Sequence, residues 1–94
     1  MFVILLKFAD KGRAGLLMEG HKDWIQRGFD DGVFLLSGSL MPNLGGSIVA
    51  HNVERAALER RLAEDPFVAE GVVTAEILEL VPSRVDDRLK FLVA

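Results

Sequence analysis

Apolar residues recur along this chain with two different spacings, and each spacing predicts a different kind of element. Residues 2–8 (FVILLKF) are β-branched, aliphatic and aromatic, and they end at the polar sequence ADKG, which is the pattern of a strand. Similar apolar runs over 33–40, 47–53 and 72–81 predict three more strands, and Pro82 ends the last of them. The sequence therefore predicts four strands.

Between these strands, apolar residues recur three and four positions apart, which is the spacing of one helix face. Residues 14–32 predict a first helix with Gly32 as its C-cap glycine, and residues 54–63 predict a second helix with Asn52 as its N-cap. The stripe on the first helix consists of Leu17, His21, Trp24, Ile25 and Gly28. After the second helix, the pair Asp65-Pro66 predicts that the helix stops and restarts.

The elements follow one another in the order β-α-β-β-α-β, which is the order of the split βαβ or ferredoxin-like fold. With right-handed crossovers, this order gives a four-stranded antiparallel sheet with both helices on one face. The predicted class is therefore α+β, in a single domain over residues 1–94. Its core spans about residues 1–82, and the tail 83–94 is compatible with a strand, a helix or an ordered arm.

Both faces of the predicted sheet are apolar. On the first strand, one face consists of Phe2, Ile4, Leu6 and Phe8, and the other of Val3 and Leu5. A sheet with one wet face should instead alternate apolar and polar residues. Two helices cover one face only, and at roughly 25 cal/mol per Å² the other face would be costly to leave in water. We therefore predict a homodimer that packs its open sheet faces together; the alternative is that the tail 83–94 folds back over that face.

Composition narrows the class of protein. The chain has 94 residues, of which 50% are hydrophobic, and no cysteine, which excludes disulfides, thiol nucleophiles and thiolate metal sites and fits a reducing cytoplasm. A net charge of −3 gives no electrostatic footprint for nucleic acid. The apolar opening MFVILLKF is too short to span a bilayer and lacks the basic region of a signal peptide. We therefore expect a soluble cytoplasmic protein that binds neither nucleic acid nor a membrane.

The predicted topology brings distant residues to one end of the sheet. His21 lies ten residues before Asp31, which places it about 15 Å from that end of the first helix at a rise of 1.5 Å per residue. Asp65 follows a second helix that runs in the opposite direction over a similar length, so it reaches nearly the same height. The loop 41–46 joins the second and third strands at that end as well. The sequence therefore permits contact between the His21 imidazole and the Asp65 carboxylate.

An ordered set of motifs resembles the YciI-like (YCII-related) proteins of the dimeric α/β barrel group, over about residues 1–82. The set consists of the histidine on the first helix, the sequence DDGVFLLSGSL that follows this helix, the Asp-Pro-aromatic box at 65–67, and Gly71. The resemblance implies a ferredoxin-like homodimer in which His21 and Asp65 form a catalytic pair.

One position departs from the pattern of this family. Many relatives have an arginine three residues before the histidine, where this chain has Met18. Arg13 lies one loop away, and we expect it to replace that cation as a substrate-binding residue.

A His–Asp pair suits a defined range of chemistry. Histidine can take or give a proton near pH 7, and a carboxylate on its other nitrogen fixes the tautomer and favours the imidazolium. No serine or cysteine lies at a recognisable nucleophile elbow, so acyl transfer is not supported. The pair suits proton abstraction next to a carbonyl, isomerisation, or elimination from a small cyclic or aromatic-derived substrate. The resemblance points the same way, because the wider group includes muconolactone isomerase-like enzymes, and one branch is credited with dehydrochlorination of chlorinated hydroquinones.

The predicted function is therefore an isomerase, or a lyase of the dehydrochlorinase type, that works without a cofactor. Trp24 and Phe67 would supply apolar walls for an aromatic or lactone ring, and we add Ser39 on the second strand to the substrate-binding residues. His21 and His51 are too few for a zinc site and have no helix-spaced partner, so no metal is predicted.

Each of these residues also has a structural explanation. Asp65 before Pro66 is a well-formed N-cap, His21 could donate a hydrogen bond inside the core, and Trp24 could be a core residue. Two other functions also remain open: a cofactor-free monooxygenase of the same barrel group, and a non-catalytic small-ligand-binding or regulatory module. The fold does not choose among them.

Overall fold

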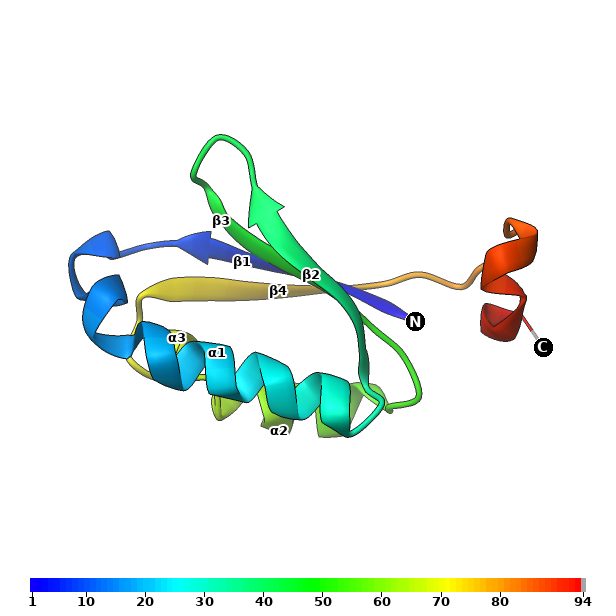
Figure 1. Ribbon diagram of the computed structural model, residues 1–94, viewed down its shortest axis with the longest axis horizontal. Helices are drawn as coiled ribbons and strands as arrows, with labels where there is room; N and C mark the ends of the chain where they lie inside the picture. Colours follow the sequence, from blue (N-terminus) through cyan, green and yellow to red (C-terminus); the bar gives the residue numbers. More distant parts are fainter. Residues whose placement is uncertain (94) are drawn as a thin grey trace.

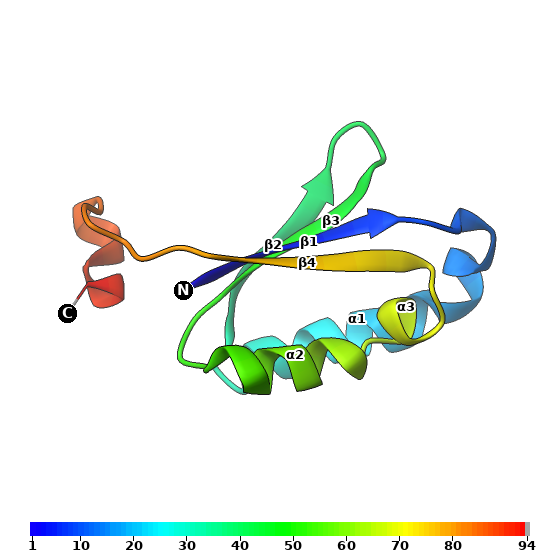
Figure 2. The same ribbon diagram turned by 180° about the vertical axis from the view of Figure 1, so that it is seen from behind.

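Four antiparallel strands form one sheet in the order β2-β3-β1-β4, and the long helices lie together on one side of it (Figure 1, Figure 2). The structure is a computed structural model and describes residues 1–93. The strands are β1 Phe2–Phe8, β2 Phe34–Leu40, β3 Gly45–Ala50 and β4 Val73–Glu79. The helices are α1 Ala14–Asp30, α2 Arg55–Ala63 and α3 Pro66–Ala69, with 3-10 helices η1 Lys11–Arg13 and η2 Asp87–Leu92. No helix within residues 1–93 is long and apolar enough to cross a membrane. The arrangement is the predicted α+β, ferredoxin-like one.

Two local signals bound the first helix. Asp10 accepts a hydrogen bond from the backbone N–H of Gly12 at 3.0 Å and caps η1, which leads directly into α1. Gly32 follows α1 with a φ of 73°, a left-handed conformation that glycine adopts without steric cost. The predicted C-cap glycine is therefore confirmed.

The core lies between the helices and the sheet. Its buried side chains come from every layer: Phe2, Ile4 and Leu6 from β1, Ile48 and Ala50 from β3, Trp24 from α1, and Leu58 and Leu62 from α2. Alternate residues of β1 point into this core, which is the burial pattern of a strand with one covered face. The core therefore occupies the face of the sheet that the two long helices cover.

The opposite face of the sheet carries a row of aliphatic side chains with no helix over it. The register places Leu36 opposite Val49, Val49 opposite Val3, and Val3 opposite Leu78, so that the row crosses all four strands. Leu36 is 55% exposed and Leu78 is 46% exposed. The open face is thus apolar, as the sequence predicted, and we refer to these four residues as the open-face row.

The tail does not cover this face. Both views show the chain leaving the end of β4 and running away from the sheet to the separate helix η2 (Figure 1, Figure 2). Near the end of the tail, the Phe91 ring lies 5.9 Å from the His51 ring, measured between centroids. The alternative in which the tail 83–94 folds back over the open face is therefore wrong for residues 83–93, while residue 94 lies outside the described residues.

Several predicted element ends move by one to three residues. β3 ends at Ala50 rather than at residue 53, and Asn52 adopts a left-handed φ of 51° in the turn that follows. Asparagine tolerates this conformation better than most residues because its short polar side chain can bond locally. The prediction that Asn52 is the N-cap of α2 is therefore wrong. Glu54 holds that position, without a side-chain capping bond. β4 ends at Glu79, earlier than the predicted residue 81.

Candidate active site

The break between α2 and α3 places a carboxylate beside the histidine of α1. α2 ends at Ala63 and α3 begins at Pro66, so the predicted restart of the helix is confirmed. Asp65 is the N-cap of α3, where its Oδ1 accepts the backbone N–H of Phe67 at 3.0 Å and Pro66 occupies the first turn. The same Oδ1 lies 2.8 Å from Nδ1 of His21. The imidazole and the carboxylate, separated by 44 positions in the chain, are therefore hydrogen-bonded.

A glycine lets the two helices meet at this point. Gly20 directly precedes His21 on α1 and lies against Pro66, where an added Cβ would be 3.2 Å from Pro66 Cγ. Interiors are close-packed, so a Cβ at this position would require its neighbour Pro66 to shift by a few tenths of an ångström. The glycine thus allows a close approach of α1 to α3 beside the histidine.

Capping alone does not explain why Asp65 is buried. Asp10 and Asp86 cap the two 3-10 helices with the same bond to a backbone N–H two residues on, at 3.0 Å, and their side chains are 56% and 55% exposed. The Asp65 side chain is 0% exposed, and its Oδ2 has no hydrogen-bond partner among residues 1–93. An unpaired buried oxygen costs on the order of 1–3 kcal/mol. This carboxylate is therefore held beside His21 at an expense in stability that a helix cap does not require.

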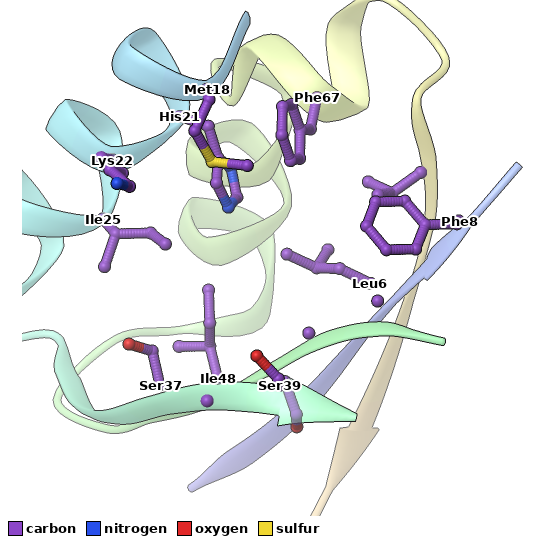
Figure 3. Close-up of a pocket in the computed structure, with 15 residues that line it drawn as sticks. Leu6, Phe8, Met18, His21, Lys22, Ile25, Ser37, Ser39, Ile48 and Phe67 are labelled. Carbon is purple, nitrogen blue, oxygen red and sulfur yellow. The ribbon is translucent and has the colours of Figure 1, made fainter. Parts of the chain in front are cut away.

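Asp65 and Phe67 together fix the orientation of the imidazole. The Phe67 ring is stacked on the His21 ring, with centroids 4.0 Å apart and planes 6° apart. Because an ionised carboxylate only accepts hydrogen bonds, the Nδ1–H of His21 donates to Asp65 Oδ1, and Nε2 is the free nitrogen of the ring. Figure 3 shows the ring directed into a cavity. Nε2 is thus the nitrogen available to a molecule in that cavity.

The cavity has a volume of about 290 Å³ and lies between α1, α3 and the hairpin of β2 and β3 (Figure 3). Its apolar lining consists of Leu6, Phe8, Met18, Ile25, Ile48, Phe67 and Val73. Its polar lining residues are His21, Lys22, Ser37, Ser39 and Ser47. Mostly apolar walls with a few polar groups are typical of sites for small organic molecules. The described residues contain no group of three or more His, Cys, Asp or Glu side chains that could hold a metal ion.

The cavity exists because both strands of the hairpin carry small residues there. The register places Ser37 opposite Ile48, Gly38 opposite Ser47, and Ser39 opposite Gly46. The hairpin also bends away from α1 toward its tip, as Figure 1 shows. Earlier in β2, Phe34 fills the equivalent space: a Cβ added at Gly28 of α1 would lie 2.1 Å from its ring. The hollow therefore lies beside α1 from Met18 to Ile25, and it ends where Phe34 packs against Gly28.

Three of the predicted site residues, His21, Phe67 and Ser39, line the cavity, and Asp65 holds the His21 ring. Trp24 does not line it. Its side chain is 2% exposed, its ring packs edge-on against Phe34 with centroids 5.2 Å apart, and its Nε1 donates to the Arg61 carbonyl at 2.9 Å. The structure therefore places Trp24 in the core, where its hydrogen bond and packing hold it, and not on the wall of this cavity.

Arg13 also lies away from the cavity. Its guanidinium donates to the Glu70 carbonyl, and it lies 3.6 Å from the Glu70 carboxylate and 3.7 Å from that of Asp10. These contacts join η1 to the end of α3. Arg13 is not among the residues that line the cavity, so the structure does not bring it together with His21.

Three of the polar lining residues, Lys22, Ser37 and Ser47, were not predicted from the sequence. Ser37 lies two residues before Ser39, and the strand period of two would have placed both hydroxyls on one face. Lys22 directly follows His21, and one step along a helix turns about 100°, so helical spacing gave no reason to associate it with the histidine. Met18 lines the same cavity.

Comparison with known proteins gives a match at the level of structure. No family model matches the chain, and no curated protein matches its sequence. A similar solved structure is that of 5-chloro-2-hydroxyhydroquinone dehydrochlorinase (TftG) from Burkholderia phenoliruptrix AC1100, in complex with 2,5-dihydroxybenzoquinone. The TM-score is 0.65 at 10% sequence identity, and the match covers 85% of this chain and 93% of that one. The likeness shows that the two proteins share a fold, in agreement with the ferredoxin-like arrangement that the sequence predicted.

Proposed function

We propose that this protein is a small-molecule enzyme that transfers a proton with His21, which Asp65 holds in place. The observation that carries the proposal is the 2.8 Å bond from His21 Nδ1 to a fully buried carboxylate, at the wall of a mostly apolar cavity. Neither a helix cap nor a core histidine requires a buried carboxylate oxygen without a partner. Such unsatisfied groups concentrate at functional sites, which favours the catalytic interpretation over the structural one.

The reacting atom is Nε2 of His21. In the neutral ring with its hydrogen on Nδ1, Nε2 carries a lone pair and can take a proton from a substrate carbon next to a carbonyl. The resulting imidazolium keeps its Nδ1–H on Asp65, whose negative charge stabilises it. If the proton returns to a different atom, the reaction is an isomerisation. If a neighbouring carbon loses its leaving group instead, the reaction is an elimination, as a lyase or dehydrochlorinase performs.

The cavity favours a small cyclic or aromatic-derived substrate. Phe67 and the aliphatic lining residues offer flat and apolar contacts, while the Ser39 hydroxyl can bond an oxygen of the ring. A volume of about 290 Å³ admits one ring with a few substituents. The dehydrochlorinase of similar fold was solved with 2,5-dihydroxybenzoquinone, a single ring, which supports a substrate of this size.

The proposal includes a homodimer of the YciI-like kind, packed through the open face of the sheet. The open-face row presents Leu36 and Leu78 to solvent, and burying apolar surface gains roughly 25 cal/mol per Å². Replacing Leu78 by Glu should therefore convert the dimer into a monomer, whereas the same change at exposed Leu16 of α1 should not. Sedimentation analysis measures both. A monomeric unaltered protein at micromolar concentration would contradict this part of the proposal.

Solvent exchange tests the catalytic part without knowledge of the product. Small cyclic ketones, lactones and halogenated hydroquinones are incubated with the protein in D₂O, and NMR follows deuterium entering the carbon next to the carbonyl and the release of halide. The substitutions His21→Asn and Asp65→Asn should each lower the rate of deuterium exchange or halide release by about a hundredfold to ten-thousandfold. His51→Asn and Asp86→Asn are the matched controls, because they alter the other histidine and an exposed capping aspartate.

Other outcomes of the same screen point to the other functions. Oxygen consumption with quinol substrates, in place of exchange, would indicate a cofactor-free monooxygenase. Ring compounds that bind but neither exchange nor turn over would indicate a binding or regulatory module. Rates that His21→Asn and Asp65→Asn leave unchanged would rule out the His–Asp mechanism.

A further inference from the structure

The charges around the cavity are one-sided. Among residues 1–93, no aspartate or glutamate lines it, and Lys22 is the lining residue with a fixed charge. Asp65, the nearest acid that we have described, is fully buried and holds the far nitrogen of the His21 ring. A molecule in the cavity therefore meets an ammonium group and an imidazole, with no carboxylate among the lining residues to repel a negative charge.

Lys22 is free to make such a contact. Within residues 1–93 its ammonium group has no carboxylate within 4.0 Å, whereas the guanidinium group of Arg61 has one and that of Arg13 has two. Figure 3 shows Lys22 beside Ile25 at the edge of the cavity, on the same helix as His21. An ammonium group at the rim of a mostly apolar cavity favours a ligand whose charge lies at one end and whose ring lies inside.

Two hydroxyl groups on the opposite wall are free as well. Ser37 and Ser39 are alternate residues of β2, so their side chains leave the same face of the strand on the order of 7 Å apart. In the part of the chain that the structure describes, neither hydroxyl donates to a protein group, whereas Ser47 donates to the Ile4 carbonyl at 2.8 Å. Hydroxyls without a protein partner are available to oxygen substituents on a bound ring.

We propose that the cavity selects a ring that carries a carboxylate, with the carboxylate on Lys22 and oxygen substituents of the ring on Ser37 and Ser39. This inference rests on the proposed function, because it takes the cavity of His21 as the substrate site. It names the substrate class: cyclic carboxylic acids with a carbonyl or hydroxyl group on the ring. In this orientation the reacting carbon of the ligand faces Nε2 of His21, which lies on the wall opposite the two serines.

Binding of simple ring probes tests the charge requirement. Benzoate and benzamide have nearly the same shape and differ in charge, and their dissociation constants can be measured by NMR titration of the isotope-labelled protein. Benzoate should bind at least about tenfold more tightly than benzamide. Added salt should weaken the binding of benzoate and leave the binding of benzamide unchanged. Replacing Lys22→Gln should abolish this difference, and Lys22→Arg should restore most of it. Lys7→Gln is the matched control, since it removes the same charge from an exposed residue of β1 outside the cavity.

A second pair of probes tests the serines. 3-Hydroxybenzoate should bind more tightly than benzoate, and Ser37→Ala or Ser39→Ala should reduce this preference while leaving benzoate affinity within about twofold. Ser83→Ala, in the tail, should leave the preference unchanged.

Several results would overturn the inference. These are equal affinity for benzoate and benzamide, an equal effect of Lys22→Gln and Lys7→Gln, or no binding of either probe at millimolar concentration. Its failure is distinguishable from failure of the proposed function. Turnover of neutral rings that depends on His21 would contradict the carboxylate requirement and support the proposed enzyme function. Selective binding of carboxylates without any turnover would support the carboxylate requirement and contradict the enzyme function.

Discussion

The two ends of the layer between α1 and the sheet are made from the same elements and filled in opposite ways. At one end, the Phe34 ring of β2 packs edge-on against Trp24 of α1, with centroids 5.2 Å apart, and leaves no space. At the other end, His21 of α1 and Ser39 of β2 lie on the walls of a cavity of about 290 Å³. We call these the closed end and the open end.

The difference arises within one short stretch of β2. The sequence FLLSGS over residues 34–39 changes from a large aromatic residue to residues with almost no side chain, and β3 places Gly45 and Gly46 beside them. One strand can therefore complete a packed core and, three to five residues later, leave a hollow. The closed end stabilises the fold, and the open end is free to hold the polar groups that a reaction needs.

The largest expected effect is at the closed end. Phe34→Ala removes a ring that contacts both Trp24 and Phe29, and we expect a loss of about 3–5 kcal/mol in the free energy of unfolding. Ser37→Ala, on the same strand at the open end, should change it by less than about 0.5 kcal/mol. Urea denaturation measures both variants. Similar losses at the two positions would show that the ends are not packed differently.

A smaller effect is expected where α1 approaches β2. Gly28→Ala puts a Cβ 2.1 Å from the Phe34 ring and should destabilise the protein by about 1–3 kcal/mol. Gly15→Ala on the same helix meets no atom within 4 Å, and it should stabilise the protein by up to about 1 kcal/mol because alanine favours helix. Thermal unfolding gives the sign of each change. If both glycines respond alike, the close contact at Gly28 is not what fixes the helix on the strand.

Filling the open end should alter binding more than stability. Ser39→Leu places an apolar side chain in the cavity, so the free energy of unfolding should change by less than about 1 kcal/mol while ring probes lose measurable binding. Ser83→Leu in the tail is the control for added apolar surface. Retained affinity for ring compounds in Ser39→Leu would place their binding site elsewhere on the molecule.

The smallest effect concerns the exposed aspartate cap. The Arg88 side chain, and then its backbone N–H, lower the pKa of Asp86. A pKa that is lower in the folded than in the unfolded state adds stability above the unfolded value of about 3.9, and this stability is lost as the pH falls through the folded value. An NMR titration of Asp86 should therefore give a midpoint below that of an ordinary aspartate, and Arg88→Gln should raise it. An unchanged midpoint in Arg88→Gln would contradict the assigned cause.

Local signals made most of the fold predictable. Periods of two and of three to four residues identified the strands and long helices, and Gly32 and Asp65-Pro66 gave correct helix ends because each acts through its own backbone conformation. Asn52 misled because asparagine favours both N-caps and left-handed turns, and the sequence alone does not say which it adopts.

The candidate site was predictable only in part, because it depends on partners far apart in sequence. His21 and Trp24 share one helical stripe, and periodicity does not tell which of them lies over Phe34 and which over the small residues of the hairpin. Arg13 is bonded to Glu70, which lies 57 positions away. Lys22 falls outside the stripe. The register of β2 on β3, which creates the cavity, is a property of the folded sheet.

The ring nitrogens of His21 provide the most direct test of the account. The chain has two histidines, so ¹⁵N NMR of the labelled protein resolves both rings, and a His51→Asn variant assigns them. In mildly alkaline solution, the account predicts that His21 carries its hydrogen on Nδ1, and that a bound ring carboxylate shifts the Nε2 resonance of His21 and leaves His51 unchanged. Two results would contradict the claim that Asp65 holds this imidazole for proton transfer in the cavity. One is a hydrogen on Nε2 of His21. The other is a His21 ring whose resonances stay unchanged while other signals of the protein show that the ligand has bound.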